Sequence, residues 1–379
     1  MPNFPQNKIA AVEARVFRLP IANPVRTSFG VMNSRPAVLV RAVDPHGMEG
    51  WGEIWCNFPS VGAEHRARLL RETVAPLLAG RSFAAPGDIW RSASQALSVL
   101  AIQSGEPGPI AQCLAGVDMA LWDLAARARN EPLYRHLGAP NAVARLPVYA
   151  SGLNPDQPEK LAAAKAREGH RAFKLKVGFG RDVDLANLAS LRAALGEDAT
   201  LMVDANQAWD LETAKAMSKA IAQFRPAWLE EPLRADAPAN HWRELARVSP
   251  IPLAAGENMR GDEFRTAIDS GWVKVLQPDL GKWGGFTGCR DVGRHALAAG
   301  IRLCPHWLGG GIGLIASFHL LAAVGGDGLV EVDANPNALR ELMATPFPAL
   351  ADGQMALPQG PGLGVAPDLA ALREFEVAA

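Results

Sequence analysis

Two lysines lie two residues apart in a short apolar run, Arg171–Val177, that ends before Gly178. Side chains at positions i and i+2 of a β-strand point to the same face, so Lys174 and Lys176 are expected to share one. Each ammonium group disfavours the charged form of the other, which predicts a lowered pKa for at least one lysine, toward the range of a general base. Taken alone, the run is also typical of an edge strand whose lysines prevent aggregation.

Ionisable residues then recur at nearly constant intervals along the second half of the chain. The series consists of Lys176, Asp204, Glu230, Glu257, Asp279, His306 and Glu331, with separations of 28, 26, 27, 22, 27 and 25 residues. One strand and one helix of a (β/α) barrel of about 250 residues take roughly this length, and functional groups lie at the C-terminal ends of its strands. Taken alone, Asp204 could cap a helix and His306 could be a satisfied core histidine. Seven such residues in phase predict one shared barrel mouth.

Three of these residues are carboxylates on consecutive predicted strands: Asp204, Glu230 and Glu257. Converging carboxylates repel one another unless a cation lies between them, and carboxylates with water are ligands that suit Mg²⁺. The sequence therefore predicts a magnesium site. Glu230 and Glu231 are neighbours, so only one of them is expected to point inward. Asn206 is expected to share a face with Asp204 and to support the metal or the substrate.

Asp279, His306 and Glu331 complete the predicted site. Asp279 could accept a hydrogen bond from the ring N–H of His306, which would fix its tautomer and raise its pKa. Glu331 could donate a proton to a substrate carboxylate as negative charge develops there.

The pattern of apolar runs from about residue 146 onward is that of an α/β protein. Amphipathic or alanine-rich segments alternate with short apolar runs, which predicts eight strands and seven intervening helices in a parallel (β/α) barrel. The predicted strands cover residues 146–151, 172–177, 200–204, 227–230, 252–256, 273–277, 301–304 and 328–332. The glycine-rich turn at 309–313 leads into a helix and could bind phosphate, although it lacks the lysine of a P-loop.

The first part of the chain has a different pattern. Predicted strands at 8–19 and 36–54, followed by helices at 63–79 and 110–129, indicate a separate α+β domain. Residues 21–34 are predicted to form a long loop, which in compact domains is often a lid or binding loop. This loop and the irregular segment 55–60 supply the candidate substrate-binding residues Arg26, Ser28, Trp55 and Asn57.

These patterns predict an N-terminal α+β domain over residues 1–143, which the family resemblance given below implies is a capping domain, and a barrel over 144–348. A Pro/Gly-rich segment, 349–379, is expected to pack back on the cap.

Composition narrows the class of protein. The chain has 379 residues, 49% of them hydrophobic, and a net charge of −1, which allows a large core and argues against nucleic-acid or membrane-surface binding. The sequence has no run of about 18 apolar residues, so no membrane-spanning helix is predicted. The four scattered cysteines are expected to be free and buried, and no signal peptide is recognisable, so a cytoplasmic protein is predicted.

The motifs together resemble those of the enolase superfamily, mandelate racemase subgroup, over nearly the whole chain. The matching segments are Lys174–Lys176, Val203–Asn206, Trp228–Pro232, Ala255–Asn258, Gln277–Gly285, Cys304–His306, Val330–Asp333 and, upstream, Gly116–Asp123. The resemblance implies an enolase-type (β/α) barrel under an N-terminal capping domain, and a homo-oligomer.

The resemblance also implies roles for residues. Mg²⁺ would be bound by Asp204, Glu230 and Glu257. Lys176 would be the base on one face of the substrate, tuned by Lys174. The His306–Asp279 pair would act on the opposite face, and Glu331 would hydrogen-bond the enolate. Lys282 falls where another subgroup has a catalytic lysine, but the presence of Asp279 and His306 disfavours that role here.

The implied activity is Mg²⁺-dependent removal of the proton α to a carboxylate of a small substrate, through an enolate. A lyase that dehydrates a sugar acid to a 2-keto-3-deoxy acid is favoured by the polar residues of the predicted loop. An isomerase that racemises or epimerises a 2-hydroxy acid is the alternative, because Phe29, Trp55 and Phe58 would also suit an apolar group. A non-catalytic binding protein on the same fold is the second alternative.

Overall fold

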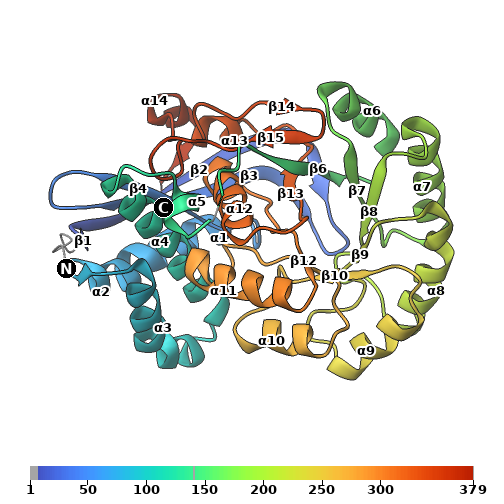
Figure 1. Cartoon of the computed structure of the whole chain (residues 1–379), viewed down its shortest axis with the longest axis horizontal. Coiled ribbons are helices and arrows are strands. Elements are labelled where there is room, and N and C mark those ends of the chain that lie inside the picture. Colours follow the sequence, from blue (N-terminus) through green and yellow to red (C-terminus); the bar gives the residue numbers. More distant parts are fainter. Residues whose placement is uncertain (1–6, 140, 379) are drawn as a thin grey trace.

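The computed structural model describes residues 7–139 and 141–378, and within them eight parallel strands form a barrel (Figure 1). The strands are β6 (Arg145–Leu153), β7 (Ala172–Lys176), β8 (Thr200–Asp204), β9 (Leu229–Glu230), β10 (Leu253–Ala255), β11 (Val275–Leu276), β12 (Arg302–Leu303) and β13 (Val330–Asp333). They follow one another in sequence order from β6 to β12, and β13 lies beside β6. The predicted barrel is confirmed.

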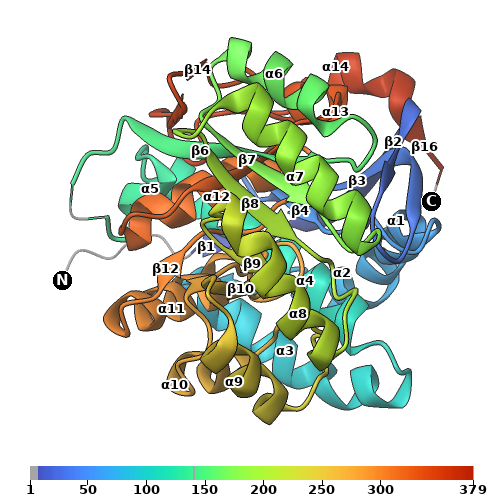
Figure 2. The ribbon, with the colours of Figure 1, turned by 90° about the vertical axis from the view of Figure 1, so that its right-hand side faces the viewer.

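Helices surround the strands. They are α6 (Pro158–Glu168), α7 (Arg181–Leu195), α8 (Leu211–Ile221), α9 (Ala239–Val248), α10 (Asp262–Asp269), α11 (Gly285–Ala298) and α12 (Gly311–Val324). Figure 2 shows α6, α7 and α8 over the outer face of β6, β7 and β8. Residues 311–323 of α12 are all buried, because this helix lies between the barrel and the N-terminal domain.

The N-terminal domain is an antiparallel sheet covered by helices. Its strands lie in the order β16 (Glu376–Val377), β2 (Ala11–Arg26), β3 (Val31–Val43) and β4 (Glu49–Ile54). Its helices are α1 (Gly62–Leu69), the π-helical turn Leu70–Val74, α2 (Ala75–Leu78), α3 (Pro86–Gln103), α4 (Pro107–Ala128) and α5 (Leu133–His136). A separate pair is formed by β1 (Asn7–Lys8) and β5 (Ser82–Phe83).

The last part of the chain contacts both domains. After α13 (Ala338–Met343), strands β14 (Leu350–Ala351) and β15 (Gln354–Ala356) extend the barrel sheet beside β6. After α14 (Leu369–Leu372), β16 pairs with β2 of the N-terminal domain. The boundaries 1–143, 144–348 and 349–379 stay a prediction.

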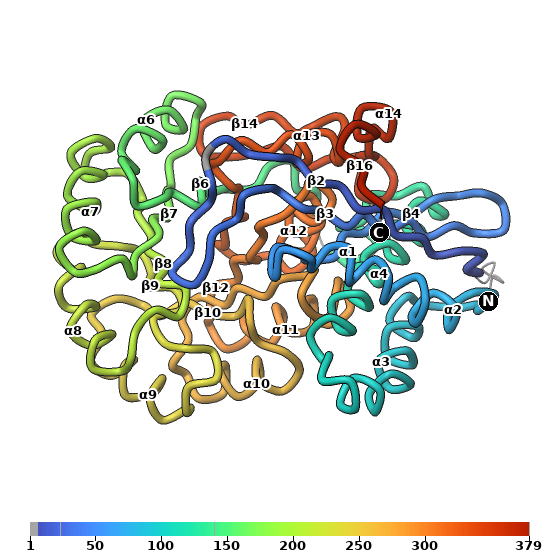
Figure 3. The backbone as a smooth tube through the Cα atoms, turned by 180° about the vertical axis from the view of Figure 1, so that it is seen from behind, coloured from blue at the N-terminus to red at the C-terminus, as the bar shows by residue number. Residues whose placement is uncertain are grey.

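The predicted loop at residues 21–34 is wrong. Strands β2 and β3 continue as a long hairpin, and only residues 27–30 form its tip, where the Thr27 N–H donates to Gly30 O at 2.9 Å. Proline is tolerated at positions 20 and 24 because β16 pairs only with Phe17 and Val16, which leaves this part of β2 an edge strand, and because the pairing with β3 is irregular between Pro20 and Val25. Figure 3 shows the hairpin reaching over to the end of the barrel near β8.

Buried acids join the two domains. Glu53 of β4 accepts the N–H groups of Gly310 and Gly313 at 2.5 and 3.0 Å, at the start of α12. Burial raises the pKa of Glu53 to about 7, although these N–H groups oppose the rise. The glycine-rich turn therefore binds a carboxylate of the protein itself, and its interpretation as a phosphate site is wrong. Asp118 likewise accepts from the Thr287 N–H and hydroxyl at 2.9 and 2.6 Å.

Close contact between β4 and α4 requires glycine. A Cβ atom at Gly52 would lie 2.0 Å from the carbonyl oxygen of Gly116. We expect Gly52→Ala to lower the free energy of unfolding by about 1–3 kcal/mol, because the rigid backbone of α4 must move. Urea denaturation would measure this. Gly108→Ala in α4, where the nearest atom to a Cβ is 3.9 Å away, is the control and should not lower the stability of the protein. Equal urea midpoints for the two variants would contradict the prediction.

His319 of α12 is buried and neutral. Its Nδ1 accepts the Tyr134 N–H and its Nε2 lies 3.1 Å from Leu363 O. Burial lowers its pKa to about 4, below the ordinary value of 6.5. Neutral His319 therefore stabilises the folded state fully above pH 6.5. This contribution to the free energy of unfolding, on the order of 3 kcal/mol, is lost as the pH falls toward 4. We expect the urea midpoint of His319→Gln to change less between pH 6.5 and 4 than that of the wild type. The same pH dependence in both proteins would contradict this.

All four cysteines are free and buried, as predicted. In the part of the chain that the structure describes, no helix has the length and apolar character to cross a membrane.

Candidate active site

The predicted acid–base and metal residues converge at the C-terminal ends of the barrel strands. Parallel pairing places Lys176 opposite Asp204, and Asp204 opposite Glu230, at the ends of β7, β8 and β9. All are buried except Glu257, which is partly exposed.

Both lysines are paired with carboxylates. Lys174 Nζ lies 2.6 Å from Glu230 Oε1 and 2.8 Å from Glu331 Oε1, and Lys176 Nζ lies 2.5 Å from Asp204 Oδ2. Burial lowers the pKa of Lys176 and repulsion from Lys174 adds to this, but the charges of Asp204 and Glu230 outweigh both and raise it. The predicted lowering of a lysine pKa is therefore wrong for this structure, because the carboxylates of neighbouring strands were not included in the two-lysine argument.

His306 is held between acids. Its Nδ1 lies 2.6 Å from Asp279 Oδ2, which is the predicted contact, and its Nε2 pairs with Glu257. Asp279 is itself fixed by the Gly281 N–H at 2.8 Å. Burial opposes the charged ring, but Glu257 and then Glu331 outweigh it and raise the pKa of His306 well above its ordinary value. Both ring nitrogens face carboxylate oxygens, so this arrangement favours the protonated ring, which can donate a proton.

Glu331 is an acceptor in this arrangement. It accepts from the Ser151 hydroxyl and from the Trp307 N–H at 3.1 Å. Although burial favours the neutral acid, the charges of Lys174 and His306 lower the pKa of Glu331 to about 2. The predicted proton donation by Glu331 does not agree with this ionised state.

Glu231 also belongs to the site, contrary to the prediction that only one of the two glutamates points inward. Strand β9 ends at Glu230, and Glu231 has a φ of +37°, so the strand alternation no longer applies to it. Asn258 Nδ2 donates to both Glu231 oxygens at 2.9 Å and to Glu257 Oε1 at 3.0 Å. Burial, and then the charge of Glu257, raise the pKa of Glu231 to about 8.

Two amides of the site were not singled out from the sequence. Asn258 bridges two glutamates, and Gln277 Nε2 donates to Glu230 Oε2 at 2.6 Å. Gln277 follows β11 directly and Asn258 is the third residue after β10, so their position in the repeat was the available signal.

The donor set fits Mg²⁺ chemically. Asp204, Glu230 and Glu257 provide oxygen atoms only, and Asn206 Oδ1 is buried without a hydrogen-bond partner. Burial, and then the charge of Asp204, raise the pKa of Glu230 to about 7, as expected of carboxylates that need a cation. Among residues 7–139 and 141–378, however, no three His, Cys, Asp or Glu side chains stand around one point as ion ligands. Each carboxylate is paired with Lys174, Lys176 or His306 instead, so these pairs must open to hold an ion.

The predicted substrate-binding residues divide into two groups. Ser28 lies at the mouth, where its hydroxyl donates to Asn206 O at 2.7 Å, and Asn206 Nδ2 donates to Asp204 Oδ2 at 3.2 Å. The Arg26 side chain is exposed and makes no contact with the carboxylates. Its backbone N–H donates to Asn154 Oδ1 at 3.3 Å, and both residues line a cavity beside the hairpin.

The other two come from the segment after β4. The Trp55 ring lies 4.5 Å from Lys282 Nζ, and that ammonium donates to Asn258 Oδ1 at 3.1 Å. Asn57 is buried and donates to Leu308 O at 2.6 Å, so it joins the segment after β4 to the connection between β12 and α12.

Comparisons with known proteins agree with this architecture. Residues 11–138 match the family "Mandelate racemase / muconate lactonizing enzyme, N-terminal domain", and residues 158–371 match "Enolase C-terminal domain-like". The chain is 29% identical to D-galactarolactone cycloisomerase of Agrobacterium fabrum, over 98% of this chain and 99% of that protein. It is 34% identical to D-galactonate dehydratase of Klebsiella pneumoniae over 72% of each chain.

Solved structures are similar over the full length. The mandelate racemase/muconate lactonizing enzyme of Bordetella bronchiseptica RB50 has a TM-score of 0.91 and 51% identity, covering 98% of this chain and 100% of that one. An enolase from Bradyrhizobium, complexed with magnesium and mandelic acid, has a TM-score of 0.86 and 29% identity, covering 99% of this chain and 100% of that one.

Proposed function

Because the chain belongs to the mandelate racemase/muconate lactonizing enzyme family of the enolase superfamily, we propose that it abstracts the proton α to the carboxylate of a sugar acid and eliminates the oxygen from carbon 3. The product would be a 2-keto-3-deoxy acid. The sugar-acid names of the two relatives support this substrate class.

One observation carries the proposal: two proton-transfer groups flank three carboxylates. Lys176 ends β7 and His306 follows β12, and strands β8 to β10, which bring Asp204, Glu230 and Glu257, lie between them in the sheet. A substrate whose carboxylate meets this centre would present opposite faces to the lysine and the histidine. Such an arrangement suits removal of a proton on one side and delivery of a proton on the other.

The chain's own residues have the following proposed roles. Asp204, Glu230 and Glu257 would hold Mg²⁺. When bound, Mg²⁺ would neutralise the carboxylates that raise the pKa of Lys176 and would stabilise negative charge on the substrate carboxylate. Neutral Lys176 then accepts the α-proton, and the C–H electron pair forms the enolate.

The imidazolium of His306, whose pKa Glu331 and Asp279 still raise when Glu257 holds Mg²⁺, donates its Nε2 proton to the oxygen on carbon 3 as that C–O bond breaks. The enolate electrons form the new C=C bond, and the resulting enol tautomerises to the ketone. Lys174 supplies a second positive charge near the substrate carboxylate. Glu331 holds that ammonium in place rather than donating a proton.

The leaving oxygen defines a second candidate reaction. If it is a hydroxyl group, the enzyme is a dehydratase. If it is the ring oxygen of a lactone or anhydro sugar, the ring opens and the enzyme is a cycloisomerase. The cycloisomerase relative matches 98% of the chain, whereas the dehydratase relative matches 72%, which favours keeping ring opening as this candidate.

A screen in D₂O with Mg²⁺ separates the reactions. The substrates would be D-galactonate, D-galactarolactone, 3,6-anhydrogalactonate and mandelate, followed by proton NMR and mass spectrometry. A keto product that has lost one water indicates a dehydratase, and one of unchanged composition indicates a cycloisomerase. Deuterium at the α-carbon without a keto product indicates a racemase or epimerase. Binding without exchange or product for every substrate would contradict the proposal and favour a non-catalytic binding protein.

A further inference from the structure

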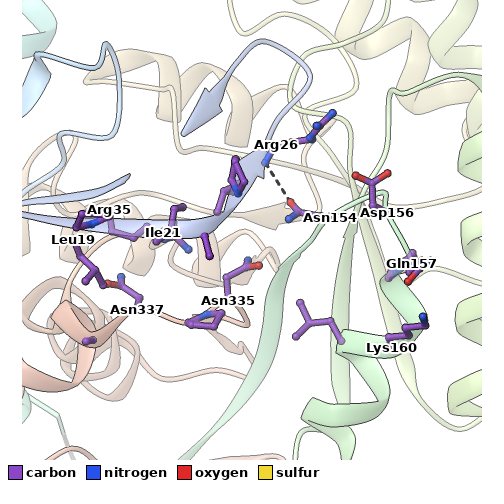
Figure 4. A pocket seen from close by; sticks show the side chains of 18 residues that line it. Leu19, Ile21, Arg26, Arg35, Asn154, Asp156, Gln157, Lys160, Asn335 and Asn337 are labelled. Carbon is purple, nitrogen blue, oxygen red and sulfur yellow. Dashed lines mark hydrogen bonds between the residues drawn. The ribbon is translucent and has the colours of Figure 1, made fainter. Parts of the chain in front are cut away.

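A cavity of about 860 Å³ lies beside the β2–β3 hairpin (Figure 4). Three segments line it: the hairpin, the β6–α6 connection with the first turn of α6, and the β13–α13 connection. Its lining residues do not include Lys176, Asp204, Glu257 or His306. Cavities of this size accommodate small organic ligands.

Its polar lining residues suit an anion that carries hydroxyl groups. Arg26 of the hairpin and Lys160 of α6 are cationic and exposed, against one acid, Asp156. The start of α6 has no side-chain cap, so the positive end of the helix dipole adds to these charges and is opposed by Glu159 of the first turn. Four amide side chains also line the cavity: Asn154, Gln157, Asn335 and Asn337.

Two lining residues have unused hydrogen-bonding atoms. Arg35 pairs with Asp333, and Asn337 Nδ2 donates to Gly309 O at 3.0 Å, so both side chains are held in place. Arg35 Nε and Asn337 Oδ1 are nevertheless buried without a partner, and these residues are only 3% and 4% exposed. Buried polar atoms in native proteins usually have a partner, so this wall has capacity for a donor and an acceptor of a ligand.

Apolar side chains lie among the polar ones. Leu19, Ile21, Pro24 and Val25 of the hairpin and Leu161 of α6 face the same cavity. Such side chains suit the C–H face of a sugar chain or ring, whose hydroxyl groups then face the amides.

We propose that this cavity is a second, non-catalytic binding site for a small polyhydroxylated carboxylate. The cations and the start of α6 would bind the carboxylate, and the asparagine and glutamine amides would bind the hydroxyl groups. The ligand bridges the hairpin and the barrel, so it holds the hairpin in the position where Ser28 bonds to Asn206 O at the catalytic mouth. The site requires neither the metal nor the reaction of the proposed function.

Metal-free protein tests this site separately from catalysis. We would titrate D-gluconate into the EDTA-treated full chain by calorimetry and follow hydrogen exchange of the hairpin amides. The wild type is expected to bind, with slower exchange in residues 19–35. Lys160→Glu and Asn335→Leu should weaken binding at least tenfold, whereas Lys165→Glu, on the same helix but outside the cavity, should not. Lys160→Glu and Lys165→Glu should keep the wild-type urea midpoint and the turnover found with Mg²⁺. Asn335→Leu also removes the hydrogen bonds of this amide to Asp333 Oδ1 and Gly152 O, so Lys160→Glu is the decisive variant.

Several results would overturn the proposal. One is no binding to metal-free wild-type protein. Another is binding that survives Lys160→Glu and Asn335→Leu but is lost in Lys174→Met, which would place gluconate at the catalytic mouth. A third is a change of sedimentation coefficient in Lys160→Glu with unchanged gluconate binding, which would show that a second copy of the chain covers the cavity.

Discussion

Replacing Lys176 with methionine is expected to lower kcat for the substrate found in the screen by about 10²–10⁴-fold, the usual contribution of a general base. Methionine keeps most of the length and apolar character of the buried side chain but cannot accept a proton. The ammonium of Lys176 lies 2.5 Å from Asp204 Oδ2, at the proposed metal centre. Its removal takes a positive charge away from this carboxylate, so Mg²⁺ binding should not weaken. Steady-state kinetics and Mg²⁺ calorimetry would measure both quantities.

Lys282 provides the matched control. Its ammonium also lies in the mouth, 3.4 Å from Glu257 Oε1, but it is engaged by Asn258 and the Trp55 ring. Lys282→Met should therefore retain α-proton exchange. If Lys282→Met loses exchange while Lys176→Met keeps kcat within about tenfold of the wild type, the proposed base is wrong. If kcat and Mg²⁺ affinity fall together in Lys176→Met, the lysine supports the metal site and is not the base.

The barrel and most of its mouth were predictable because they depend on local repeats. Each strand is a short apolar run, and Asp204, Glu230 and His306 come at or just after the end of such a run. The nearly constant spacing of the series follows from the length of one strand–helix unit, which the sequence displays directly.

Features that depend on contacts between distant segments were not predictable. The charge state of Lys176 is set by carboxylates on other strands, and Glu231 turns inward through one backbone angle at the end of a two-residue strand. Glu53 meets the start of α12 although 257 residues separate it from Gly310. A strand through Pro20 and Pro24 is possible because β2 has no second neighbour there among the described residues; its other neighbour, β16, comes from the far end of the chain and pairs only with Phe17 and Val16.

The hairpin also depends on a buried ion pair, and removing one partner is expected to have the largest effect on stability. Arg35 of β3 pairs with Asp333 at the end of β13, and their side chains are only 3% and 4% exposed. Arg35→Leu leaves the Asp333 carboxylate buried without its counter-charge. We expect this to lower the free energy of unfolding by about 3–5 kcal/mol, measured by urea denaturation.

A double-mutant cycle separates the lost pairing from lost packing. Asp333 Oδ1 also accepts the backbone N–H and the Nδ2 of Asn335 at 3.0 and 2.9 Å, so Asp333→Asn keeps an acceptor there while it removes the charge. Arg35→Leu combined with Asp333→Asn should be more stable than Arg35→Leu alone, because no uncompensated charge is then buried. Strictly additive effects would contradict this account. The pair joins the hairpin to the strand that carries Glu331. Arg35→Leu should therefore also speed hydrogen exchange in residues 19–35 more than in β7 or β8. This result would link the stability of the N-terminal domain to the closure of the mouth.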